Sequence, residues 1–171
     1  ADGKVLYMAV PRLAHTKCFV ELTAASLERK GIALKDAATM RGAMRHGRLV
    51  AFEDMRAIDL VVVGCVAVAP NGGRTGKGAG FADLELAMLR ECNLISEHTP
   101  VVTTVHDLQI VDTVELPMQN HDWWLDLIVT PTQSLITHNN HPKPTGLDWN
   151  SIQSDQLAII PILRTWAQHR D

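Results

Sequence analysis

The sequence lacks the features that mark several large classes of protein. Its 171 residues hold 16 Lys and Arg against 19 Asp and Glu, a net charge of −3, which provides no basic surface for nucleic acid. No apolar run approaches the roughly 18–20 residues that a membrane span needs. The opening residues 1–4 do not have the pattern of a signal peptide. We therefore expect a partner that is neither nucleic acid nor membrane.

Cysteine is also scarce. Cys18, Cys65 and Cys92 are odd in number and far apart, which disfavours a disulfide framework and favours a reducing, cytoplasmic location. Their apolar or helical surroundings indicate buried thiols and not a catalytic cysteine. The remaining composition, 46% hydrophobic and 20% charged, is ordinary for a globular protein. The length suits one domain over residues 1–171 with a substantial core.

Several familiar catalytic motifs are absent. A glycine-rich loop at residues 71–83 fails the P-loop pattern, because Gly78 follows Lys77 where Ser or Thr is required. Its G-x-G-x-G spacing also differs from the dinucleotide-binding fingerprint. There is no HExxH and no paired Cys/His set for zinc, and no G-x-S-x-G elbow for a serine nucleophile. These absences exclude the standard motifs, but the glycine-rich loop can still bind phosphate through its backbone amides.

The glycine-rich loop is the most informative stretch that the sequence does have. It holds five glycines together with Arg74, Lys77 and Asp83. An apolar run at 60–70 precedes it and an amphipathic segment at 81–92 follows, the strand–loop–helix arrangement that binds phosphate. The alternative is a mobile loop with no ligand, although flexible linkers are more often Ser-rich and uncharged.

Apolar patterning along the chain predicts alternating strands and helices. Strands are expected at 5–10, 57–69, 101–105 and 125–129. Helices are expected at 17–30, from a cap at Asp36 to about His46, at 81–92, and at 162–169 after Pro161. This order predicts an α/β protein with a mostly parallel sheet. Residues 137–171 are expected to form a C-terminal strap over that sheet.

Asp83 has two interpretations. An acid in the first turn of a helix complements the helix dipole and needs no ligand. If phosphates occupy the loop, however, a bare carboxylate would repel them, and Mg²⁺ between the two would remove that repulsion. Arg74 would then offer a planar fork to phosphate oxygens, and Lys77 a point charge.

A second group of polar residues follows the strand at 101–105. His106, Asp107 and Gln109 come directly after that strand, and ligands of open α/β sheets bind beyond the carboxyl ends of strands. His121 and Asp122 form a further candidate pair. The alternative for the histidines is a hydrogen-bonded structural role.

Two other polar features have structural interpretations. Asp126 precedes an apolar strand and is expected to anchor a loop through backbone bonds. His138 and His141 have no acid or thiol near them in the sequence, so a solvated loop is expected and not a metal site.

In combination, these residues resemble the 5-formyltetrahydrofolate cyclo-ligase family. The residues that carry the resemblance are the loop at 73–83, Gln109, Pro117, His121, Asp122, Asp126 and the run 128–131. The opening segment 3–13 also resembles that family, and the closing segments 144–149 and 160–163 resemble its longer, cyclo-ligase-like branch. The resemblance covers nearly the whole chain.

The resemblance implies a three-layer α/β/α fold like that of CoA transferases and sugar-phosphate isomerases. It also implies ATP- and Mg²⁺-dependent closure of 5-formyltetrahydrofolate to 5,10-methenyltetrahydrofolate through a phosphorylated formyl group. Arg74 and Lys77 would then be catalytic, and Asp83 would bind the metal. The residues implied for ATP binding are Gly73, Arg74, Gly76, Lys77, Gly78, Gly80 and Asp83. The residues expected to contact the substrate, a reduced folate or related metabolite, are Phe81, Gln109, His121 and Asp122.

The sequence also departs from the family pattern. Family members carry a Lys/Arg motif for ATP phosphates and a glutamate for folate upstream of a segment like 3–4, so we expect the chain to lack the family's N-terminal part. Catalysis is expected to depend on that part. Phe81 and Ala82 stand where the family has two tyrosines. One alternative is a paralogue, for example a thiamine-related one, that binds a nucleotide or phosphorylated metabolite without closing a ring. The other is a non-catalytic interaction module.

Overall fold

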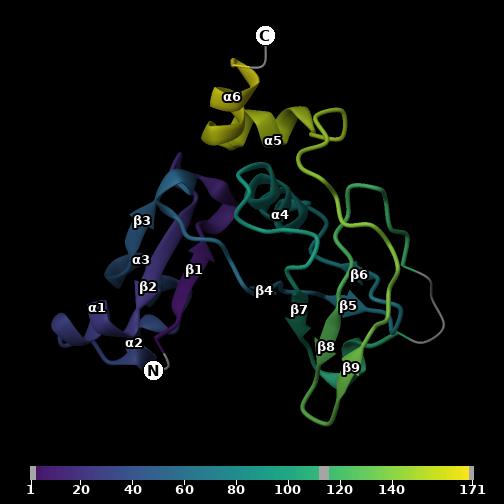
Figure 1. Ribbon diagram of the computed structural model, residues 1–171, viewed down its shortest axis with the longest axis horizontal. Helices are drawn as coiled ribbons and strands as arrows, with labels where there is room; N and C mark the ends of the chain where they lie inside the picture. Colours follow the sequence, from purple (N-terminus) through teal and green to yellow (C-terminus); the bar gives the residue numbers. More distant parts are fainter. Residues whose placement is uncertain (1–2, 112–115, 170–171) are drawn as a thin grey trace. The chain divides into compact units, whose positions relative to one another are not determined.

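The computed structural model describes residues 3–111 and 116–169 of the chain. These residues form two compact units, one made of 3–55 and 152–169 and the other of 56–111 and 116–151. Strands and helices occur in both (Figure 1), so the predicted α/β class is confirmed. The predicted single domain with a strap at 137–171 stays a prediction. No helix in the described part of the chain is long and apolar enough to cross a bilayer.

The first unit is built on a three-stranded antiparallel sheet in the order β1-β2-β3. The strands are β1 (Val5–Ala9), β2 (Phe19–Thr23) and β3 (Arg48–Val50). Between them come η1 (Pro11–Leu13), α1 (Ala24–Arg29), α2 (Leu34–Ala37) and α3 (Met40–His46), and η2 (Phe52–Asp54) follows β3. The strand predicted at 5–10 is therefore confirmed as β1.

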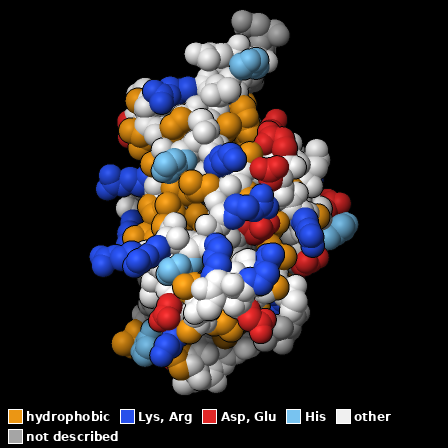
Figure 2. All heavy atoms as spheres, turned by 90° about the vertical axis from the view of Figure 1, so that its left-hand side faces the viewer, with side chains coloured by type: hydrophobic (Ala, Val, Ile, Leu, Met, Phe, Trp, Pro, Cys, Tyr) orange, Lys and Arg blue, Asp and Glu red, His pale blue; other side chains and the backbone are white. Residues whose placement is uncertain are grey.

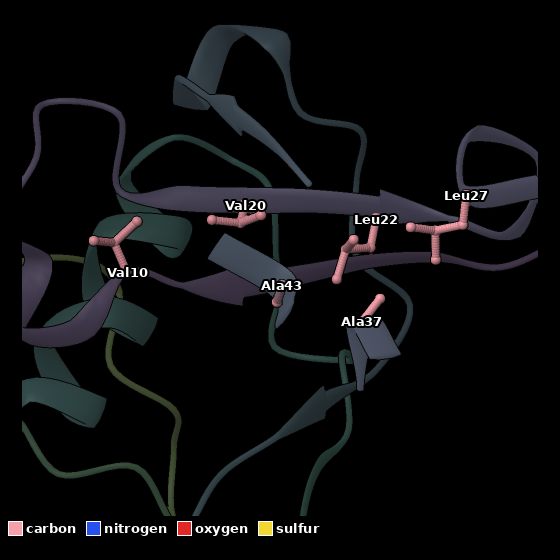
Figure 3. Close-up of a cluster of buried hydrophobic side chains, with 6 residues drawn as sticks. All are labelled: Val10, Val20, Leu22, Leu27, Ala37 and Ala43. Atoms are coloured by element: carbon pink, nitrogen blue, oxygen red, sulfur yellow. The ribbon is translucent and has the colours of Figure 1, made fainter. Parts of the chain in front are cut away.

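The core of this unit is aliphatic. Val20 and Leu22 project from the same face of β2, since alternate residues of a strand share a face. They pack with Leu27, Ala37 and Ala43 of the three helices (Figure 3), and Val10 completes the cluster. The helices α2 and α3 approach so closely that a Cβ atom at Gly42 would lie 1.9 Å from the carbonyl oxygen of Asp36.

The helix predicted at 17–30 is wrong in its first half. Residues 19–23 form β2, and the helix α1 begins only after Thr23, whose Oγ1 accepts a hydrogen bond from the Ser26 amide at 3.1 Å. Glu21 pairs across the sheet with Arg48 at 3.0 Å. Pairing with neighbouring strands therefore overrides the helical spacing of the apolar residues. Similarly, the cap of α3 is Thr39, and Asp36 lies inside α2.

The end of the chain joins the first unit. Its helices are α5 (Ser154–Ile159) and α6 (Pro161–Ala167), and Pro161 occupies the first turn of α6 as predicted. Trp166 lies 5.4 Å from Phe52, ring centroid to centroid, and Phe52 lies 5.7 Å from Phe19. One face of the molecule shows hydrophobic side chains gathered among Lys and Arg side chains (Figure 2).

The second unit contains a four-stranded sheet in the order β4-β7-β8-β9. Its strands are β4 (Val61–Val62), β7 (Val101–Thr104), β8 (Leu127–Val129) and β9 (Ser134–Ile136). The first three are parallel and β9 is antiparallel. The remaining elements are the hairpin of β5 (Ala67–Val68) and β6 (Arg74–Thr75), the helix α4 (Phe81–Glu91) and η3 (Asp107–Gln109).

Most elements predicted for this unit are confirmed, with one correction. The strands at 101–105 and 125–129 and the helix at 81–92 correspond to β7, β8 and α4. The single central strand predicted at 57–69 is wrong, because β4 and β5 belong to different sheets. The chain leaves the parallel sheet after β4 and pairs with the segment that leads into the glycine-rich loop. The apolar run is continuous in sequence, but its halves have different partners.

The loop after β9 is fixed to the unit by polar contacts. Lys143 Nζ donates to Asp126 Oδ2 at 2.8 Å and to the Thr99 carbonyl at 2.7 Å. Asp126 Oδ2 also accepts from the Val101 amide at 2.7 Å, so the predicted anchor role of Asp126 is confirmed. His141 stacks on Trp124 with ring centroids 3.8 Å apart. This loop is therefore held by polar and stacking contacts, while His138 and His141 are exposed, so the expectation of a solvated loop is confirmed.

Candidate functional site

A cavity of about 650 Å³ lies in the second unit beside the glycine-rich loop. Its size falls within the roughly 300–1,000 Å³ of small-molecule sites. It is bounded by the segment that follows β4, by the loop, by the first turns of α4 and by a segment near residue 118. The residues that line it are Gly64, Cys65, Val66, Arg74, Thr75, Gly76, Lys77, Gly78, Ala79, Gly80, Phe81, Ala82, Asp83, Glu85, Pro117, Met118, Gln119 and Asp122.

The loop offers backbone amides to this cavity. Within residues 3–111 and 116–169, the amides of Gly76, Lys77 and Gly78 donate no hydrogen bond to the protein. A Cβ atom added at Gly76 or Gly78 would meet nothing within 4 Å, so the main chain there faces open space. The helix α4 starts at Phe81, after the cap residue Gly80, whose φ is +66° and which provides no side-chain cap. Uncapped amides at a helix start, next to a bare glycine loop, form a site suited to an anion.

Arg74 is buried and bound inside the protein. Only 3% of its side chain is exposed, and its Nη2 forms an ion pair with Asp83 Oδ1. Its Nε donates to the Trp123 carbonyl at 2.8 Å, while the Trp123 amide donates to Asp83 Oδ1 at 3.0 Å. The guanidinium therefore fixes one oxygen of Asp83. The other oxygen, Oδ2, accepts no hydrogen bond in the described residues.

Lys77 is the exposed cation of the cavity. Its side chain lies at the surface of the glycine-rich loop, and no carboxylate in the described part of the chain pairs with it. An exposed ammonium on a flexible aliphatic stem can move toward a bound anion. Of the two cations predicted to bind phosphate, Lys77 is therefore the one available to a ligand. Arg74 is already engaged by Asp83.

Glu85 is a cavity residue that sequence reasoning missed. Its carboxyl is half-buried, and burial raises its pKa from 4.5 to about 7, an effect that Arg74 opposes and Asp83 reinforces. It forms no hydrogen bond or ion pair with the described residues. Phe81 lies one turn earlier on the same face of α4 and lines the same cavity. The helical spacing of these two residues was the signal that could have identified Glu85.

The structure brings together part of the predicted site. Gly76, Lys77, Gly78, Gly80, Phe81, Asp83 and Asp122 line the cavity together with Arg74. Gly73 does not line it, and its amide donates to Asn71 Oδ1 at 3.0 Å. His121 is also outside the lining, and its Nε2 lies 3.7 Å from Asp122 Oδ1.

Gln109 supports the cavity wall from behind. Its Nε2 donates to the carbonyls of Cys65 at 3.1 Å and Val66 at 3.0 Å. Its Oε1 accepts from the His106 amide at 2.8 Å. Because Cys65 and Val66 line the cavity, Gln109 positions that wall without contacting the cavity itself.

A second, shallower hollow of about 420 Å³ lies at the carboxyl ends of β7 and β8. Gln109, His106, Thr104 and Thr130 contribute to its wall. Asp107 beside it accepts hydrogen bonds from Thr130 at 2.5 Å and Thr132 at 2.6 Å, and these bonds lower the pKa of its carboxyl. The predicted placement of His106, Asp107 and Gln109 at this edge of the sheet is confirmed.

The cavity suits a cation only together with a ligand. Among the described residues, no three His, Cys, Asp or Glu side chains converge as a metal site. A magnesium ion would therefore take Asp83 Oδ2 and complete its shell from phosphate oxygens and water. Magnesium commonly binds in this way, through one or two carboxylates and substrate phosphates.

The sequence of the chain is similar to those of known proteins. The 5-formyltetrahydrofolate cyclo-ligase family matches residues 1–131. The methenyltetrahydrofolate synthase domain-containing protein of Bos taurus is 42% identical over 162 residues, which cover 95% of this chain and 42% of the bovine protein. The Mus musculus protein of that name is 42% identical over 161 residues, covering 94% of this chain and 43% of its own length. The Homo sapiens protein is 41% identical over 162 residues, covering 95% and 42%.

This chain spans less than half of the length of these relatives. The match includes the whole glycine-rich loop, the first turns of α4 and the segments that line the cavity. The chain belongs to the 5-formyltetrahydrofolate cyclo-ligase family.

Proposed function

We propose that the protein uses ATP and Mg²⁺ to convert 5-formyltetrahydrofolate to 5,10-methenyltetrahydrofolate. The observation that carries the proposal is the cavity in which free loop amides, Lys77 and Asp83 meet. Its support from the comparisons is membership of the cyclo-ligase family. In such a reaction the formyl oxygen attacks the γ-phosphorus of ATP and ADP leaves. The neighbouring amine then attacks the formyl carbon and loses its proton, and the carbon–oxygen bond breaks as phosphate leaves. The protein's task is to position the reactants and stabilise charge.

Each part of the cavity has a proposed role. The amides of Gly76, Lys77 and Gly78 bind phosphate oxygens, and the Lys77 ammonium neutralises their charge. Asp83 holds Mg²⁺, which supplies charge neutralisation at the phosphates when bound. Gly80 permits the turn that aims the start of α4 at the same point. Phe81 and Asp122 contribute the wall on which the folate rests.

Arg74 has a different role from that expected of an exposed cation. Its guanidinium is occupied by Asp83 and the Trp123 carbonyl, so it cannot present a fork to phosphate without breaking a buried ion pair. We propose that Arg74 is a positioning residue, which orients Asp83 and leaves its Oδ2 open, so that Asp83 would hold Mg²⁺.

The proposal predicts a direct spectroscopic result. The natural full-length protein, supplied with 5-formyltetrahydrofolate, ATP and Mg²⁺, should generate the absorbance of methenyltetrahydrofolate. Lys77→Ala should raise the KM for ATP about tenfold, because a charge-assisted hydrogen bond contributes about 1.5–3 kcal/mol. Lys35→Ala, which removes an exposed lysine from α2, is the matched control and should behave as wild type. Turnover that is absent, or equally fast without ATP, would overturn the proposal.

The buried state of Arg74 favours a second candidate function. With one of its two cations engaged, the cavity suits a single nucleotide or phosphorylated metabolite that it binds without closing a ring. Calorimetric titration with Mg·ATP, thiamine diphosphate and 5-formyltetrahydrofolate, together with the turnover assay, distinguishes the two candidate functions. Binding of a phosphorylated ligand without turnover supports this candidate, whereas turnover rejects it.

A further inference from the structure

Among the described residues, three acidic side chains line the cavity, and two of them already accept hydrogen bonds from the protein. Asp83 Oδ1 takes the Arg74 guanidinium and the Trp123 amide. Asp122 Oδ2 accepts from the Gln119 amide at 2.8 Å. Glu85, in the second turn of α4, accepts no hydrogen bond and forms no ion pair within residues 3–111 and 116–169. Among these three described carboxyls, Glu85 is therefore the one of which both oxygens are left without a protein donor.

An open carboxyl in this position requires an explanation. A half-buried polar group without a hydrogen bond is costly, and natural proteins satisfy the large majority of such groups. Glutamate is also seldom buried unless it is paired. Glu85 also lies near Asp83, whose negative charge repels a negative charge on Glu85. A ligand in the cavity that brings hydrogen-bond donors to the carboxyl would lower these costs.

The donors cannot come from phosphate, because phosphate oxygens are acceptors and carry the same charge as the carboxylate. They can come from an amino-substituted heterocycle. Phe81 lies one helical turn before Glu85 and lines the same cavity, so a flat ring and an acceptor share one face of α4. An aromatic surface beside a carboxylate suits a planar ring with N–H groups along its edge.

We infer that Glu85 binds the edge of the pteridine ring of the substrate, accepting hydrogen bonds from its ring N–H and adjacent exocyclic amino group. This inference rests on the proposed function for the choice of ring. Two adjacent donors match the two oxygens of one carboxylate, in the way that paired donors match it elsewhere. Adenine offers its amino group next to a ring nitrogen acceptor and so presents only one donor to the same carboxylate. Glu85 therefore selects the folate and leaves the nucleotide to the glycine-rich loop.

The test is a comparison of Glu85→Gln with wild type in the natural full-length protein. Glutamine keeps the shape but replaces one acceptor with a donor that faces the donors of the ring. The KM for 5-formyltetrahydrofolate should rise about tenfold or more, while the KM for ATP stays within about twofold. Glu97→Gln is the matched control, since Glu97 has a side chain that is 70% exposed, and it should change neither value.

A modified ligand tests the contact itself. A folate in which a methyl group replaces the exocyclic amino group should bind wild type about tenfold more weakly than the parent compound, measured by calorimetry. Glu85→Gln should discriminate less between the two ligands, because its side chain no longer accepts from the amino group. A structural role of Glu85 would weaken both ligands equally, and that result would overturn the inference.

These measurements also separate the inference from the proposed function. If the wild-type protein binds 5-formyltetrahydrofolate but does not convert it, the proposed ring closure fails. A larger dissociation constant for this folate in Glu85→Gln than in wild type would still support the inference. An unchanged folate affinity in Glu85→Gln overturns it, as does an effect on ATP alone. Wild type that binds no folate overturns both.

Discussion

The two units of the chain use charge in opposite ways. In the first unit the core is aliphatic, and the ion pair between Arg48 and Glu21 lies at the surface, with 59% of the Arg48 side chain exposed. In the second unit Arg74 is buried with Asp83, and Lys143 is held by Asp126. A folded core gains little from buried charges, which lose their hydration. These contacts distinguish the second unit from the aliphatic core of the first unit.

The largest expected effect comes from breaking the buried pair. Arg74→Met should lower the free energy of unfolding by about 3–5 kcal/mol, because it leaves the Asp83 carboxylate buried without its partner. Arg48→Met removes the corresponding cation of the first unit and should cost no more than about 1 kcal/mol, as is usual for exposed pairs. Urea unfolding of the two variants measures the contrast. Equal losses would contradict the difference between the units.

A pH-dependent change is expected at Glu85. Because its folded pKa is about 7 against an ordinary value of 4.5, the folded protein binds more protons than the unfolded chain between these values. The contribution of Glu85 to the free energy of unfolding is therefore fully present below about pH 4.5, and it is lost as the pH rises through about 7.

Glu85→Gln removes this loss. Relative to wild type, the variant should gain on the order of 3 kcal/mol in the free energy of unfolding between about pH 4 and pH 8. Urea titrations at several pH values measure it, with the exposed Glu97→Gln as control. A pH profile identical to that of wild type would show that the carboxyl is not held in this state.

Substitution of two glycines, one in each unit, compares a position needed for packing with a position expected to bind a ligand. Gly42→Ala should lower the free energy of unfolding by about 1–3 kcal/mol, since its Cβ meets the Asp36 carbonyl between α2 and α3. Gly76→Ala should change stability by no more than about 0.5 kcal/mol, because its Cβ enters open space. The same Cβ should weaken nucleotide binding by calorimetry. A destabilised Gly76→Ala would show that this loop is packed and not open.

The sequence predicted the parts of the site that are local. The loop at 71–83 and the helix α4 follow from glycine content and helical spacing over adjacent residues. The state of Arg74 could not be predicted, because its partner at the Trp123 carbonyl lies 49 residues away. The strand β2 was mistaken for a helix for the same reason, since pairing with β1 and β3 decides its conformation. Glu85 falls between these cases: its face of α4 was predictable, but its lack of a partner was not.

The most direct test of the account follows the backbone amide signals of the protein by NMR as Mg·ATP is added. We expect the largest shifts at Gly76, Lys77 and Gly78, with smaller shifts at the start of α4 and none in β1, β2 and β3. Saturable shifts confined to residues outside the glycine-rich loop, or none anywhere, would contradict the claim that this loop binds phosphate.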